Sequence, residues 1–161
     1  MSPPPAPMPP TSASRPAVPS DHPVRDAADA LCRAAQESSH QHDRLARVLK
    51  HGLDDLELEG VAEVVELCDG ILIRATARYE MVAADGRARD EAWWRAANAL
   101  WMAAREYCRR HAQSDAVASR LKKHGAKQLS EISVEYELEL SARIALRQAL
   151  AGYLAVRPEA A

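Results

Sequence analysis

Residues 58–82, LEGVAEVVELCDGILIRATARYEMV, decide the fold of this chain. Apolar side chains recur through this segment at alternating spacings of three and four residues. The residues of this stripe are Leu58, Val61, Val65, Cys68, Leu72, Ala75, Tyr79 and Val82. A period near 3.5 residues places them all on one side of an α-helix, whereas a half-buried strand alternates every two residues. We therefore expect a long helix with one buried side.

Comparable stripes lie before and after this segment, and each predicts a further long helix. The stripe before it consists of Val24, Ala28, Leu31, Ala35, Ser38, His42, Leu45 and Leu49. The stripe after it consists of Trp94, Ala97, Trp101, Ala104, Cys108 and His111. Asp54 or Asp55 can cap the start of the middle helix, and Gly52 can end the first. Short connections make consecutive helices antiparallel neighbours.

The last part of the sequence predicts one short helix and one long helix. Ser114 and Asp115 resemble a fresh helix cap, which opens a short segment ending at Gly125. A final stripe follows, formed by Leu129, Ile132, Tyr136, Leu140, Ile144 and Leu150. The expected fold is therefore all-α, an antiparallel bundle of four long helices plus one short helix over residues 21–157.

Composition limits the kind of protein further. Residues 1–20 contain eight of the ten prolines, so we expect a disordered, Pro-rich leader. The net charge of −2 gives the 161-residue chain no overall attraction for nucleic acids or anionic lipids. No apolar run approaches the ~18 residues that a membrane span requires. Three widely spaced cysteines and no apolar signal segment indicate a reducing cytoplasm rather than a disulfide scaffold.

Four residues with metal-ligand chemistry fall on inward stripes: His42, Cys68, Cys108 and His111. Counting along the hairpins at 1.5 Å per residue puts His42 and Cys68 within ~5 Å of the same height, and Cys68 level with Cys108. Thiolate and imidazole are the usual ligands of zinc, so the set is a candidate zinc site. The alternative is that the cysteines are small core residues and the histidines lie at the edge of the core, because no CxxC spacing is present.

Charge is unevenly distributed along the helices. Seven acidic residues and no basic one occur from Asp54 to Asp69, whereas residues 105–127 are strongly basic. The basic residues are Arg105, Arg109, Arg110, Arg120, Lys122, Lys123 and Lys127. This segment is a candidate for contact with a nucleic-acid backbone. The alternatives are a solvated, internally balanced face, or attraction to the acidic segment within the chain or across subunits.

A second apolar line suggests a protein interface. Trp93, Leu100 and Tyr107 are spaced by seven residues, and Val64 and Ile71 form a similar line on the preceding helix. Together these five residues add more apolar surface than one hairpin partner covers. Another helix of the same bundle, a second subunit or a client protein would cover it, and interfaces are enriched in Trp and Tyr.

Known catalytic and cofactor patterns are not evident in the sequence. It contains no HExxH spacing, nucleophile elbow or phosphate-binding glycine loop, and the ExxH pair of Glu37 and His40 flanks the inward stripe. We therefore expect a non-enzymatic interaction protein, an adaptor, scaffold or chaperone-like module that forms a homo-oligomer or binds a protein client. A nucleic-acid-binding protein and a zinc-binding bundle are the alternatives, and we expect no cofactor other than zinc.

Overall fold

The computed structural model describes residues 22–52, 54–84, 91–124 and 129–157, so the predicted leader at residues 1–20 lies outside the described residues. These ranges contain four α-helices and no strand, which confirms the predicted all-α class. The helices are α1 (His22–His51), α2 (Asp55–Ala84), α3 (Ala92–His124) and α4 (Leu129–Val156). Over the same ranges, no helix is both long and apolar enough to cross a bilayer.

The turn between α1 and α2 is determined by local chemistry. Gly52 adopts a φ of +66°, a left-handed conformation that glycine takes without steric cost. Its N–H donates to the carbonyl oxygen of Val48 at 3.1 Å, which closes the last turn of α1. The carboxylate of Asp54 then accepts a hydrogen bond from the N–H of Glu57 at 2.9 Å and so caps α2.

The predicted short helix is absent from this part of the chain, because α3 continues through Ser114 and Asp115 as a single helix of 33 residues. The Ser114 hydroxyl donates across to the carbonyl oxygen of Glu135 on α4 at 3.4 Å. The Asp115 carboxylate lies 3.5 Å from His111 Nε2, one turn earlier on α3. Neither Ser114 nor Asp115 therefore caps a new helix. The helix boundary predicted at these two residues was wrong.

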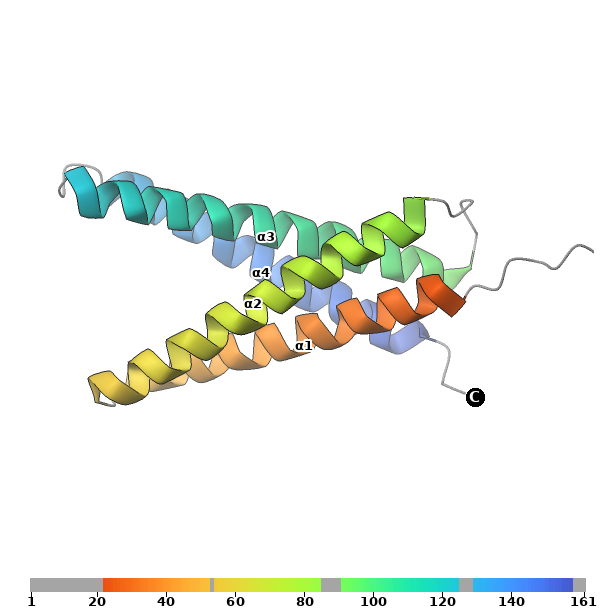
Figure 1. The fold of residues 1–161 in the computed structure, drawn as a ribbon, viewed down its shortest axis with the longest axis horizontal. Coiled ribbons are helices and arrows are strands. Elements are labelled where there is room, and N and C mark those ends of the chain that lie inside the picture. The colour runs from red at the N-terminus through yellow and green to blue at the C-terminus, as the bar shows by residue number, and fades with distance from the viewer. Residues whose placement is uncertain (1–21, 53, 85–90, 125–128, 158–161) are drawn as a thin grey trace, which may run out of the picture.

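The four helices pack as two hairpins, α1 with α2 and α3 with α4 (Figure 1). The hairpins meet at one end of the molecule, where α1 and α3 begin and α2 and α4 end. Toward the other end they diverge, so that the turn near Gly52 lies apart from the end of α3. We call the diverging parts the first arm (α1 and α2) and the second arm (α3 and α4).

The hydrophobic core occupies the half in which the hairpins meet. Its largest fully buried apolar side chains are Leu31, Leu72, Tyr79, Leu100, Tyr107, Leu146 and Tyr153. Two of the tyrosines connect neighbouring helices through their hydroxyls, Tyr79 donating to Asn98 and Tyr153 to Asp29, each at 2.9 Å. These bonds satisfy the tyrosine hydroxyls, which would otherwise oppose burial.

The apolar stripe predicted for α4 does not coincide with the side of α4 that is buried. Tyr136, Leu140 and Ile144 were expected to face inward, but they are exposed. Among residues 133–156, for which burial is described, the buried residues of α4 are Glu139, Ala142, Leu146, Leu150 and Tyr153. Of the predicted stripe residues in that range, Leu150 alone is buried, and the side chains of Leu129 and Ile132 lie outside the described ones. Hydropathy alone favoured the larger apolar residues, whereas the fold buries a small alanine and a paired glutamate in their place.

Candidate functional site

A buried carboxylate, Asp69 of α2, lies between the two hairpins and bonds to side chains of α1 and α3. Ser38 of α1 donates its hydroxyl hydrogen to Asp69 Oδ1 at 2.7 Å, and Tyr107 of α3 donates to Oδ2 at 3.0 Å. His42 Nε2 of α1 lies 2.9 Å from the same Oδ2 and 2.8 Å from the Tyr107 oxygen. All four side chains are buried. Asp69 is thus bound by three hydrogen-bonding groups from two other helices.

The network continues onto α4 through His111 of α3. Its Nε2 lies 3.7 Å from Asp69 Oδ2, and its Nδ1 lies 3.1 Å from Glu139 Oε1. Arg143 contacts the same Glu139 oxygen at 3.3 Å and lies over the Tyr107 ring. The central polar cluster therefore takes side chains from all four helices. Its members are Ser38, His42, Asp69, Tyr107, His111, Glu139 and Arg143.

The charges of the cluster favour one protonation state near neutral pH. Burial opposes ionisation of Asp69, but hydrogen bonds from His42 and Ser38 outweigh it and hold its pKa below the ordinary value. Glu139 shows the same balance, with His111 as its strongest partner, and its pKa is also lowered. The hydrogen bond to Glu139 in turn raises the pKa of His111, and burial raises that of Tyr107. The carboxylates are therefore charged and Tyr107 is neutral.

This geometry supports a structural role for the cluster. The carboxylates of Asp69 and Glu139 and the hydroxyls of Ser38 and Tyr107 are hydrogen-bonded within the cluster, whereas Arg143 Nε is buried with no hydrogen-bond partner. Asp69 and Tyr107 are almost completely buried. Hydrogen bonds to Asp69 in a low-dielectric interior resist breaking, because each broken bond leaves a buried partner unsatisfied. We conclude that the central polar cluster holds the two hairpins together.

The four predicted zinc ligands are not gathered into one ligand set. His42 and His111 both lie near Asp69. Burial raises the pKa of the Cys108 thiol to about 11 and also raises that of Cys68, which disfavours the thiolate that binds metals. Within the described ranges, no three His, Cys, Asp or Glu side chains are arranged to hold a metal ion.

Asp69 was missed as a functional residue by the sequence analysis. The height count had placed His42 level with Cys68, and the partner of His42 is the next residue along α2. A single aspartate beside an apolar stripe forms no recognisable motif. The sequence therefore indicated only the approximate height along α2 at which His42 would find a partner. A charged residue beside a stripe, at the height of an inward histidine on the neighbouring helix, is the signal that could have identified it.

The predicted interface residues of α3 lie in the core. Trp93, Leu100 and Tyr107 are all buried within the single chain, because the other helices enclose the first half of α3. Trp93 and Trp94 pack edge to face, with ring centroids 5.4 Å apart, so both indoles find partners inside the fold. The chain itself covers the apolar line that seemed to need a second subunit.

A line of residues on the outside of α2 remains uncovered. Leu67 is 61% exposed and Ile71 42%, while Val64, predicted with Ile71 as an interface residue, is partly exposed. We call this line the α2 outer face, and its members are Glu57, Gly60, Val64, Leu67, Ile71 and Arg74. They follow one another at spacings of three and four residues. In Figure 1, α2 lies in front of the other helices.

The α2 outer face begins at a hollow between α1 and α2. The hollow is lined by Arg44, Val48, Glu57, Gly60, Val61 and Val64. A Cβ atom built on Gly60 would meet no other atom within 4 Å, so the space beside this glycine is open. The hollow and the exposed apolar side chains thus occur on one continuous surface.

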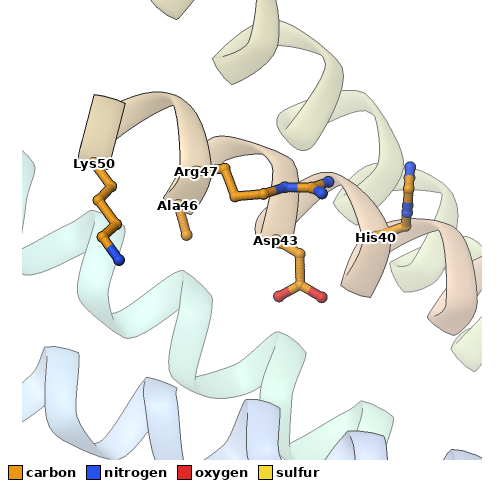
Figure 2. A pocket seen from close by; sticks show the side chains of 5 residues that line it. All are labelled: His40, Asp43, Ala46, Arg47 and Lys50. Carbon is orange, nitrogen blue, oxygen red and sulfur yellow. The ribbon is translucent and has the colours of Figure 1, made fainter. Parts of the chain in front are cut away.

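A second uncovered line runs along α4. Tyr136, Leu140 and Ile144 are exposed at spacings of four residues, and Arg147 follows on the same side. Arg147 forms an ion pair with Asp43 of α1, so this side of α4 faces the first arm. Figure 2 shows Asp43 among the residues that line a shallow hollow on α1. They are His40, Asp43, Ala46, Arg47 and Lys50.

The basic residues proposed for nucleic-acid binding fall into two groups, and Lys127 lies outside the described residues. Glu106 pairs with both Arg109 and Arg110 at 2.6 and 2.8 Å, which neutralises part of their charge. The Arg105 guanidinium lies 5.5 Å from the centre of the Trp101 ring. The remaining three are exposed near the end of α3, namely Arg120, Lys122 and Lys123.

Comparison with known proteins adds no relative. No protein family, curated protein or solved structure matches the chain. The function must therefore be inferred from the surfaces of this molecule itself. Of these, the α2 outer face combines exposed large apolar side chains with an adjacent hollow and with charge of both signs.

Proposed function

We propose that the protein acts by binding other proteins, including further copies of itself, as an adaptor, scaffold or chaperone-like module. The observation that carries this proposal is the exposure of Leu67 and Ile71 in a line with 3.5-residue spacing on α2. That spacing is typical of a seam between two helices, and contiguous exposed apolar surface is typical of interaction sites. The inner side of α2 already packs in the fold, so a further helix would pack on its outer face.

The rest of the fold supports this proposal. The core and the central polar cluster hold both hairpins in one arrangement, so the outer surfaces are presented by rigid helices. The exposed line of Tyr136, Leu140 and Ile144 on α4 offers a second surface for a different protein. Two separate apolar faces on one rigid body are what an adaptor requires. Three free cysteines fit a reducing compartment, the cytoplasm.

Nucleic-acid binding at the end of α3 is the alternative function. It rests on the exposed side chains of Arg120, Lys122 and Lys123. Binding to a phosphate backbone weakens steeply with salt, whereas an apolar protein interface is much less sensitive. Capture of nuclease-sensitive material that is released by moderate salt would favour this alternative.

The proposal is tested by placing a charge in the α2 outer face. Leu67→Glu should reduce the mass measured by light-scattering chromatography or abolish binding of the proteins that the tagged wild type captures from its native cell. A charge buried in a seam loses its hydration without gaining a partner, which disfavours association. Ala77→Glu is the matched control, because Ala77 is also exposed on α2 but lies off the outer face.

Both variants should retain the helical circular dichroism spectrum of the wild type, since both positions are exposed. If Leu67→Glu changes neither the mass nor the captured proteins, the α2 outer face is not an interaction surface and the proposal is wrong.

A further inference from the structure

The charges of the α2 outer face are separated along the helix. The half before Asp69 presents the exposed Glu57, with Glu63 beside the line, whereas the half after it presents Arg74, with Arg78 one turn further along the helix. Glu80, the acidic residue of the second half, lines a different hollow between α2 and α3. The outer side of α2 is thus negative near the turn, apolar in the middle and positive beyond.

A surface with this order of charges is complementary to itself when reversed. We infer that α2 binds α2 of a second copy in antiparallel orientation, with Leu67 of each chain against Val64 of the other. This inference rests on the proposed function, and it names the partner and the register of that surface. A twofold dimer uses the same patch on both subunits, so every contact occurs twice.

The register follows from the spacing of the outer face. When Leu67 lies opposite Val64, the same antiparallel alignment brings Ile71 opposite Gly60 and Arg74 opposite Glu57. An antiparallel helix pair brings these three pairs of positions together, because the residues of the α2 outer face repeat every 3.5 positions. The centre of the seam is apolar, and each end is an ion pair of opposite charges.

The shape of the surface fits the same register. Ile71 projects from one half of α2, and the hollow beside Gly60 lies eleven residues earlier, about 16 Å along the helix. The open space beside Gly60 can accommodate a side chain of the second copy. A larger residue at position 60 would fill this space. In the antiparallel pair, Ile71 of each copy enters the hollow of the other. One projection and one hollow on each chain are therefore both filled.

The test reverses the charge of Glu57 or of Arg74, the two residues that pair at each end of the seam. Wild-type protein should elute in light-scattering chromatography at twice its 17.6 kDa chain mass. Arg74→Glu places two acidic groups opposite each other at both ends, and Glu57→Lys places two basic groups there. Each variant alone should weaken the dimer by at least about tenfold, because like charges then face each other across the interface.

Recombining the two variants distinguishes this register from a general loss of solubility or folding. A mixture of Arg74→Glu and Glu57→Lys chains should form a heterodimer, since both ends then pair opposite charges, and the double variant should dimerise with itself. Glu80→Lys is the control and should leave the dimer intact. Circular dichroism should report the same helix content in every variant.

Three results would overturn the inference. They are a wild type that remains at one chain mass, a dimer that neither single variant weakens, and single variants whose mixture fails to dimerise. A monomeric wild type that captures a protein lost in Leu67→Glu would refute the α2 pairing but leave the proposed function standing. A dimer disrupted by Leu67→Glu but indifferent to the charge exchange would place the second copy in another register.

Discussion

Replacing Asp69 by alanine should be among the most damaging single changes in this protein. The substitution removes the common acceptor of Ser38, His42 and Tyr107, and all three lie in the buried centre of the fold. An unsatisfied buried hydrogen-bonding group costs about 1–3 kcal/mol, and Asp69→Ala leaves three such groups without their common acceptor. Asp69→Ala should therefore lower the free energy of unfolding by about 3–5 kcal/mol, or the melting temperature by about 6–20 °C.

Urea unfolding followed by circular dichroism measures this loss, and Glu106→Ala is the control. Glu106 also binds two side chains, and Arg109 and Arg110 hold its pKa at about 2 against a small effect of burial. Glu106 and Arg109 are about half exposed and Arg110 is partly exposed, so water and salt screen these pairs and the loss should stay below about 1 kcal/mol. If Asp69→Ala costs no more than Glu106→Ala, the central polar cluster does not hold the hairpins together.

Three further changes test other parts of the structure. The raised pKa of His111 means that its stabilisation is complete below about pH 6.5 and is lost as pH rises through the folded-state value. Melting curves between about pH 6 and pH 9 should therefore show a smaller fall in melting temperature for His111→Gln than for the wild type. Leu100→Ala should cost about 2–5 kcal/mol in urea unfolding because Leu100 is fully buried, and a loss below about 1 kcal/mol would remove it from the core. Gly52→Ala should cost about 1 kcal/mol, since φ of +66° is strained for alanine, and an unchanged midpoint would contradict the cap.

The sequence predicted the first two helices more accurately than the last two. On α1 and α2 the residues of the 3.5-residue stripes are mostly buried, and Gly52 and Asp54 act as the stop and start signals expected of them. Ser114 was misleading, because a serine suited to a helix cap can equally bond to a neighbouring helix. Which partner it takes depends on the position of α4, and no local pattern encodes that position.

The candidate sites show the same limit. Ile71 was named for an interface from its spacing, and it is exposed. Trp93 was named on similar grounds but lies inside the core, because the helices around the start of α3 enclose it on several sides. Glu139 was not named as a site residue, because a charged side chain is normally buried only where it has partners. Its partners are His111, which lies 28 residues earlier in the sequence, and Arg143, which lies four residues later. Spacing along one helix cannot report on such partners.

The divergence of the two arms has a consequence for how such a chain can vary in length. Toward their diverging ends, each arm is a pair of helices in which each helix is supported mainly by the other, as Figure 1 shows. Removing or adding one heptad in both helices of an arm keeps the stripe of each helix facing the other. The shared core, which lies in the opposite half, would not be displaced. Arm length is therefore free to evolve in paired seven-residue steps, whereas the joined half of the molecule admits no such change.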